Sequence, residues 1–104
     1  MNVRFFDEHI KQFVNELAIP TSAKVFRIFE LLERFGHQLG MPHSKHISRR
    51  LFELRTRGKQ EVRIFYAFRK DSAVLLHGYI KKSSKIPEKE LSLAHQKLGA
   101  LDSI

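Results

Sequence analysis

The sequence has no cysteine and no tryptophan, and it contains only three prolines and five glycines in 104 residues. Without cysteine the chain can form neither a disulfide nor a thiolate metal site, and nothing favours secretion. No apolar run approaches the roughly 18 residues that a membrane-spanning helix needs. The first residues also lack the pattern of a signal peptide. We therefore expect a cytoplasmic protein without a membrane segment.

Several motifs of common enzyme classes are also missing. The chain contains no glycine-rich phosphate-binding loop and no serine nucleophile elbow. It also has no paired carboxylates on the sheet face that we expect to be open, where Glu53 is the only acid, so the usual nucleotide-binding and hydrolase classes are not supported. Its composition is that of a packed globule, with 42% hydrophobic residues and nine phenylalanines. A chain of this length has no room for a second domain with its own core, which predicts a single domain over residues 1–104.

Positive charge is concentrated in one part of the chain. The net charge is +8, and residues 45–82 carry eleven Lys or Arg against three Asp or Glu. Residues 1–44 and 83–104 each carry equal numbers of basic and acidic side chains. A localised basic region is typical of a protein that binds a polyanion. It predicts a nucleic-acid partner, with a solvated basic surface as the alternative.

Helical spacing of apolar residues predicts two helices before this basic region. Asp7 is a good N-cap for an amphipathic helix that Pro20 ends. Thr21 or Ser22 caps a second, longer helix that stops at Gly36 or Gly40. Two helices joined by a short link form a hairpin that can cover one face of a sheet.

The remaining segments predict strands and one further helix. Apolar and polar residues alternate over residues 2–6, which predicts an edge strand. Residues 41–48 are expected to form a loop. Residues 50–56, 61–69 and 73–81 alternate between apolar and polar and are separated by short polar turns, as in successive hairpins. Pro87 begins a last helix, whose apolar face consists of Leu91, Ala94, Leu98 and Leu101. The predicted fold is α+β, with a twisted antiparallel sheet of three to four strands, the helical hairpin on one face and a C-terminal helix.

Strand alternation assigns side chains to the two faces of this sheet, because residues two apart share a face. The apolar sets expected on the core face are Phe52 and Leu54; Val62, Ile64, Tyr66 and Phe68; and Val74, Leu76, Gly78 and Ile80. The opposite face then presents Arg55, Arg63, His77, Tyr79 and Lys81. Because like charges on neighbouring strands repel, an anionic partner is the natural reason to hold them together.

These side chains suit the cleavage of RNA, whose own 2′-hydroxyl supplies the nucleophile. Arginines stabilise charge on phosphoryl oxygens, and a lysine or His77 can move protons. Tyr79, together with Phe65, can stack on an unpaired base. Two simpler interpretations remain open: Arg55 forms a salt bridge with Glu53 or Glu61, and His77 is an ordinary hydrogen-bonded strand residue. Three histidines around residues 37–46 lack a firm ligand set, so we expect no metal and no other cofactor.

Four segments, in order and at matching spacing, resemble the phage-related branch of the RelE/HigB toxin superfamily: MPHSKHI, LFELR, VRIFYAF and LLHGYIKKSSKIPEKEL. The resemblance covers residues 42–98, and a helical hairpin ahead of them is similar as well. Members are ribosome-dependent mRNA endonucleases from bacterial type II toxin–antitoxin pairs. One departure is Arg49-Arg50-Leu51, where family members often carry a glycine at the entrance to the strand.

The resemblance implies a RelE-like fold and a metal-independent endoribonuclease that cleaves mRNA on the ribosome. It implies catalytic positions at Arg55, Arg63, Lys81 and Lys82. We expect further RNA contacts from the strand and turn residues His77, Tyr79, Lys85, Arg57 and Lys59. The implied partner is a small helix-turn-helix antitoxin. Two alternatives are a gyrase inhibitor on the same fold and a non-toxic phage-derived protein that binds nucleic acid.

Overall fold

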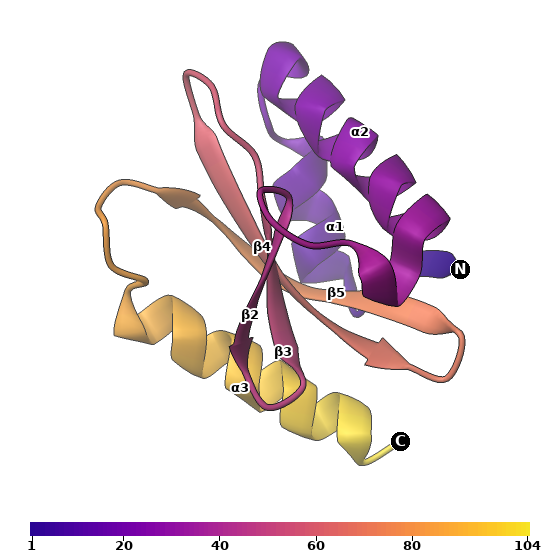
Figure 1. The fold of residues 1–104 in the computed structure, drawn as a ribbon. Helices are drawn as coiled ribbons and strands as arrows, with labels where there is room; N and C mark the ends of the chain where they lie inside the picture. Colours follow the sequence, from indigo (N-terminus) through magenta and orange to yellow (C-terminus); the bar gives the residue numbers. More distant parts are fainter.

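A five-stranded sheet forms the centre of the structure, a computed structural model that describes residues 1–104 (Figure 1). The strand order is β1-β5-β4-β3-β2. The elements in chain order are β1 (Asn2–Phe5), α1 (Glu8–Asn15), α2 (Ile19–Phe35), a short 3-10 turn (Gly36–Gln38), β2 (Ser44–Ser48), β3 (Leu51–Arg55), β4 (Glu61–Arg69), β5 (Ser72–Lys81) and α3 (Glu88–Asp102). The predicted α+β class is confirmed, with an N-terminal helical hairpin and a C-terminal helix. None of the helices is both long and apolar enough to cross a membrane.

The sheet differs from the prediction in two details. It has five strands rather than three or four, and β1 pairs with β5 in parallel, whereas the other pairs are antiparallel. The segment expected as a loop contains β2, in which Ser44 pairs with Leu54 of β3. This strand was missed because an edge strand needs no apolar alternation when its neighbour supplies the hydrogen bonds. Buried Ser44 also shares a 2.6 Å hydrogen bond with the hydroxyl of Tyr66, a core residue as expected.

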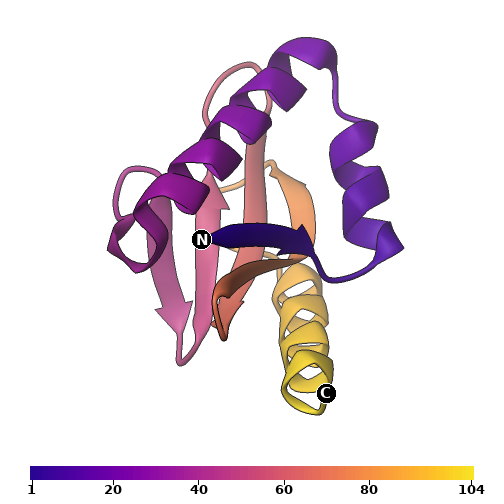
Figure 2. The ribbon, with the colours of Figure 1, turned by 90° about the vertical axis from the view of Figure 1, so that its right-hand side faces the viewer.

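The helices α1 and α2 cover one face of the sheet (Figures 1 and 2). The Asp7 carboxylate caps α1 as predicted, accepting a hydrogen bond from the backbone N–H of Ile10. Helix α2 begins at Ile19, so Pro20 lies in its first turn instead of ending α1, a position where proline's missing N–H costs nothing. Apolar residues of both helices pack on the sheet in one core: Ile10, Val14, Val25, Ile28, Phe29 and Leu32.

A register shift in β5 changes the predicted assignment of faces. Phe65 of β4 pairs with His77, but the next residue, Tyr66, pairs with Leu75, so Leu76 is an extra residue in β5. As a result Leu75 joins the core beneath the helical hairpin. Val74 and Leu76, which alternation had placed there, pack in a second core instead. The sequence pattern could not reveal a bulge within an uninterrupted apolar run.

Helix α3 covers part of the second face, on the side of the sheet opposite α1 and α2 (Figure 1). Its predicted apolar face is confirmed: Ala94, Leu98 and Leu101 are buried and pack in the second core with Phe65, Val74 and Leu76. The face expected to be open is therefore covered over part of its area. The ends of β3 and β5 and the start of β4 lie beyond this helix and carry the polar residues described next.

Candidate active site

A small cavity of about 60 Å³ opens at this end of the second face. Strand pairing explains its composition, since Arg55 lies opposite Arg63, and Arg63 lies opposite Tyr79 on the next strand. Four strands and the loop before α3 supply the lining residues: Lys45, Glu53, Arg55, Arg63, Tyr79, Lys81, Ser84 and Ile86. The cavity thus brings together four of the predicted site residues, namely Arg55, Arg63, Tyr79 and Lys81. It also contains one acidic residue, Glu53.

Glu53 is the acid at the centre of this cluster, and only 3% of its surface is exposed. Its Oε1 atom lies 3.8 Å from Nε of Arg55 and 3.9 Å from Nε of Arg63. Its Oε2 atom is buried and has no hydrogen-bond partner. Burial raises the pKa of Glu53, and the charges of Arg63 and Arg55 only partly offset this effect. A carboxylate with a free oxygen and a raised pKa is equipped to accept a proton.

Arg63 differs from the expectation that its guanidinium is free to bind phosphate. The residue is 1% exposed. Its NH1 group donates to the carbonyl oxygens of Thr56 at 3.2 Å and Val62 at 3.3 Å, and NH2 donates to Glu61 at 3.0 Å. These bonds satisfy the guanidinium inside the protein, as buried charge requires. In this conformation Arg63 therefore holds Glu53 and the end of β3 in place.

The other cations of the cavity are more accessible. The Arg55 side chain is 15% exposed, and its Nε is buried without a hydrogen-bond partner. Lys81 is half-buried and Lys45 is exposed. Lys45 was not predicted as a site residue because β2 had been taken for a loop. It pairs with Glu53 across β2 and β3, so recognising the SKHIS segment as a strand would have identified it.

Tyr79 forms one wall of the cavity. Its ring stacks on Phe65, with centroids 5.8 Å apart and planes inclined by 25°. Burial, reinforced by the nearby negative charge of Glu53, raises the pKa of Tyr79 to about 12. The phenol therefore remains protonated at neutral pH and can donate a hydrogen bond.

His77, predicted to lie among these cations, does not line the cavity. Its Nε2 atom lies 3.2 Å from the Glu90 carboxylate at the start of α3. Its ring is nearly parallel to that of His9 on α1, at a centroid distance of 6.3 Å. Burial lowers the pKa of His77, although Glu90 opposes this effect. The alternative of a hydrogen-bonded strand histidine is the one that matches this structure.

The remaining predicted residues surround the cavity without lining it. Lys82 borders a shallow polar depression together with Lys81 and Glu61. Lys85 is exposed in the loop between β5 and α3. Arg57 and Lys59 are exposed in the turn between β3 and β4. These side chains are accessible to a long ligand that extends beyond the cavity.

The three histidines considered for a metal site have separate surroundings. The His37 ring packs on the Phe68 ring, with 3.9 Å between the two ring centroids. The Nε2 atom of His46 lies within hydrogen-bonding distance of the Arg49 carbonyl oxygen. His43 lines a different groove, beside α2. No group of three or more His, Asp or Glu side chains is arranged to hold a metal ion.

Comparison with known proteins identifies one family. The model of the family described as phage derived protein Gp49-like matches residues 12–99, which include α2, all of β2 to β5 and most of α3. Comparison with curated proteins found no match.

Proposed function

Since the chain belongs to the phage-derived Gp49-like family, part of the RelE/ParE-like toxin group, we propose that it is the toxin of a type II toxin–antitoxin pair. We propose further that it is an mRNA interferase, a metal-independent endoribonuclease that cleaves mRNA on the ribosome and so inhibits translation. The supporting observation is the buried Glu53 carboxylate, which has one unpartnered oxygen and is surrounded by cations.

Each part of this cavity has a use in RNA cleavage. Once the side chains that cover its buried Oε2 atom move aside, Glu53 accepts the proton of the 2′-hydroxyl, and the 2′-oxygen attacks the adjacent phosphorus. A 2′,3′-cyclic phosphate forms as the bond from phosphorus to the 5′-oxygen breaks. Arg55 and Lys45 stabilise the charge on the phosphoryl oxygens. Lys81, or Lys82 beside it, donates the proton that the departing 5′-oxygen needs.

Arg63 and Tyr79 support these groups. Arg63 acts as a positioning residue, since its guanidinium is engaged by Glu61 and two backbone carbonyls. Tyr79 donates a hydrogen bond from its protonated phenol to the substrate. On the ribosome the mRNA is already held in place, so proximity supplies much of the rate enhancement and weak catalytic groups suffice.

The exposed cations around the cavity extend the binding surface. Lys85, Arg57 and Lys59 contact phosphates on either side of the cleaved bond, adding affinity without sequence preference. His77 is buried and contributes by holding α3 against β5. The partner we propose is a helix-turn-helix antitoxin that neutralises the toxin.

Tightly controlled expression, followed by mapping of the 5′ ends of cellular mRNAs, tests the proposal. The wild-type chain should create new ends within translated codons, and co-expression of the neighbouring gene should suppress them. The Lys81→Ala variant should lose most of these ends. Lys11→Ala, which removes the same charge from an exposed position on α1, should still produce the new mRNA ends.

Two outcomes would contradict the nuclease proposal. Growth arrest with intact mRNA and DNA-damage signalling would point to a gyrase inhibitor on this fold. Binding of purified protein to many RNAs, without cleavage or growth arrest, would point to a non-toxic nucleic-acid-binding protein.

A further inference from the structure

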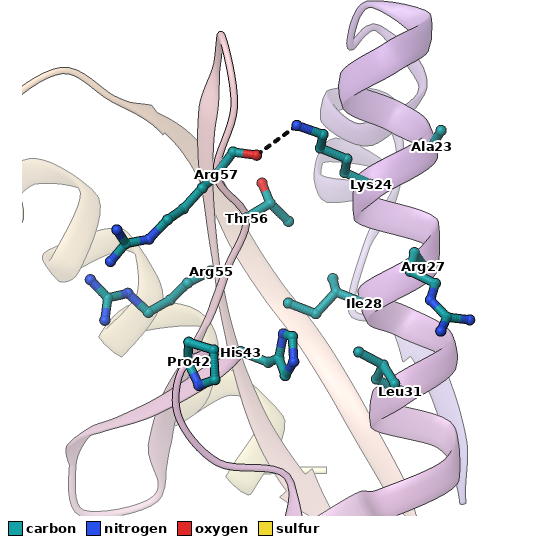
Figure 3. A pocket seen from close by; sticks show the side chains of 10 residues that line it. All are labelled: Ala23, Lys24, Arg27, Ile28, Leu31, Pro42, His43, Arg55, Thr56 and Arg57. Atoms are coloured by element: carbon teal, nitrogen blue, oxygen red, sulfur yellow. Dashed lines mark hydrogen bonds between the residues drawn. The ribbon is translucent and has the colours of Figure 1, made fainter.

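Two hydrogen bonds join the turn between β3 and β4 to helix α2. Nζ of Lys24 donates to the backbone carbonyl oxygen of Arg57 at 2.9 Å (Figure 3). The Thr21 hydroxyl donates to the side-chain oxygen of Gln60 at 3.1 Å. Thr21 and Lys24 are three residues apart in α2, so they lie next to each other on the helix surface. Helix α2 therefore holds the turn at two points.

The turn approaches the helix most closely at Gly58. The φ angle of this residue is +152°, in a region that favours glycine. A Cβ atom here would lie 2.4 Å from Nζ of Lys24. The absence of a side chain at this position therefore leaves the space in which the Lys24 ammonium reaches the turn.

The catalytic cavity holds the neighbouring part of the turn. NH1 of the buried Arg63 donates to the carbonyl oxygen of Thr56 at 3.2 Å. The carbonyl groups of two successive residues, Thr56 and Arg57, are thus bound by side chains from two different elements, β4 and α2. The backbone of Arg57 is therefore fixed both by the cavity and by the helix.

This backbone geometry determines the direction of the Arg57 side chain. Figure 3 shows its carbonyl oxygen facing Lys24, whereas the side chain extends away from α2, on the same side of the strand as the guanidinium of Arg55. Arg55 lines the catalytic cavity, and Arg57 is exposed two residues further along the chain. The Arg57 guanidinium is thus accessible to an RNA strand whose neighbouring phosphate occupies the cavity.

We infer that Lys24 is a positioning residue, which keeps Arg57 directed toward the cavity face of the sheet for binding to an RNA phosphate. This inference rests on the proposed function, in which Arg57 contacts RNA. A turn that contains glycine samples many conformations when it is free, so fixing its backbone in advance reduces the entropy that is lost on binding. The Lys24 ammonium lies on the helix side and is bound to the carbonyl, so it acts through Arg57 and not on the RNA itself.

Fluorescence anisotropy of a single-stranded RNA, titrated with the full chain, tests the inference in a double-mutant cycle. Lys24→Met removes the hydrogen-bond donor and should weaken binding about threefold or more. In an Arg57→Ala background the same change should weaken binding by less than about 1.5-fold, because the residue that Lys24 positions is then absent. Lys11→Met removes the same charge from an exposed position on α1 and should bind within about 1.5-fold of wild type.

Two further measurements separate positioning from direct contact. Arg57→Ala should make the dependence of the logarithm of the association constant on the logarithm of salt concentration shallower by about 0.7, and adding Lys24→Met should not change it further. Thr21→Val breaks the second hydrogen bond without removing a charge and should weaken binding about twofold. NMR order parameters of the Gly58 and Lys59 amides should fall in Lys24→Met, because the turn becomes mobile.

The inference would be overturned if Lys24→Met weakened binding equally in both backgrounds or made the salt dependence shallower by a further 0.7 or so, since Lys24 would then contact RNA directly. Unchanged RNA binding or unchanged order parameters in Lys24→Met would also overturn it. Absence of RNA binding by the wild type would overturn the inference and the proposed function together. Binding without cleavage of mRNA would contradict the nuclease proposal alone and leave the positioning of Arg57 standing.

Discussion

At the scale of single residues, the protonation of Glu53 depends on two opposing effects: burial raises its pKa, and the neighbouring arginines lower it. A buried carboxylate is costly unless cations and hydrogen bonds compensate it. Here two arginines approach one oxygen, while the other oxygen has no partner. Arg63 is fully engaged elsewhere, so it holds its place whether or not Glu53 is charged. The hydrogen bonds that hold Arg63 therefore do not depend on the charge of Glu53.

The first prediction concerns the substitution Glu53→Gln. This change removes the proton acceptor and keeps the side-chain shape, so mRNA cleavage in a translation extract should fall by about 10²-fold or more. The free energy of unfolding, measured in urea, should change by less than about 1 kcal/mol, because the cost of burying a charge disappears with the charge. Glu61→Gln alters the exposed partner of Arg63 and should retain most of the activity. Equal losses in both variants would contradict the assignment.

The second prediction concerns the pH dependence of cleavage. Glu53 accepts a proton only when it is deprotonated, so the rate should fall as the pH drops through its pKa. Because burial raises this pKa above the ordinary value of 4.5, the fall should be centred above pH 4.5. Single-turnover cleavage of ribosome-bound mRNA, at saturating toxin, measures the profile. A rate that stays constant down to pH 4.5 would exclude Glu53 as the base.

The third prediction concerns His77 and stability. Burial lowers the pKa of His77 below 6.5, opposed by Glu90 and assisted by Lys97 and His9. The folded protein thus favours the neutral ring, and this contribution to stability is complete above pH 6.5 and is lost as the pH falls from 6.5 through the lowered pKa.

The measurement is the free energy of unfolding of wild type and His77→Asn at pH 7.5 and 5.5. The wild type should lose more stability between these values than His77→Asn does. His95→Asn, on the exposed face of α3, should behave as wild type. An equal loss in wild type and His77→Asn would refute the prediction.

At the scale of elements, the extra residue in β5 decides which side chains reach each core. Before Leu76 the odd-numbered residues of β5 face the helical hairpin, and after it the even-numbered ones do. The shift sends Val74 and Leu76 toward α3 and leaves Tyr79 and Lys81 on the face that carries the cavity. One bulge therefore serves both the packing of α3 and the construction of the site.

The fourth prediction concerns Gly78, which allows α1 to approach β5 closely. A Cβ atom at this position would lie 2.6 Å from Cε2 of Phe13 and 3.2 Å from Cδ1 of Ile10. Gly78→Ala should therefore lower the free energy of unfolding by about 1–3 kcal/mol through overpacking. Gly99→Ala is the matched control, because nothing lies within 4 Å of a Cβ there.

Gly99 lies inside α3, so its replacement by alanine should raise stability by about 0.5–1 kcal/mol. Urea unfolding of both variants measures the two effects. Destabilisation by Gly99→Ala equal to that by Gly78→Ala would show that the packing of α1 is not the cause.

At the scale of the whole molecule, the net charge of +8 lies in the segment that builds β2 to β5. Two of the three acids in this segment, Glu53 and Glu61, pair with site arginines. The two faces of the sheet therefore differ: the helical hairpin covers one, and the other carries the cations around the cavity.

The fifth prediction concerns the salt dependence of RNA binding. If about four phosphates are contacted, the logarithm of the association constant for a single-stranded RNA should fall with the logarithm of salt concentration at a slope of about −3. Lys82→Ala and Lys85→Ala should each make the slope shallower by about 0.7. Lys11→Ala should leave it unchanged. Fluorescence anisotropy over a salt series measures the slopes, and identical slopes in all variants would contradict the assigned surface.

Most of the helices and strands, with the exception of β2, could be predicted from the local pattern of residues. The spacing of apolar residues in α1 and α2, the cap at Asp7 and the face of α3 all depend on local periodicity, which neighbouring residues express directly. The placement of Arg55, Arg63, Tyr79 and Lys81 on one face also follows from alternation within strands. For this reason the fold class could be predicted, together with these four side chains of the cavity, whereas Lys45 was missed and His77 was placed there wrongly.

How these groups are used depends on contacts between segments that lie far apart in the chain. The bulge at Leu76, the pairing of β2 with β3 and the burial of Arg63 and His77 depend on residues far apart in the chain. A strand pattern cannot reveal them, because pairing register and desolvation arise only when distant segments meet. The same cause made Glu53, a lone acid in a basic sequence, into the buried centre of the candidate site.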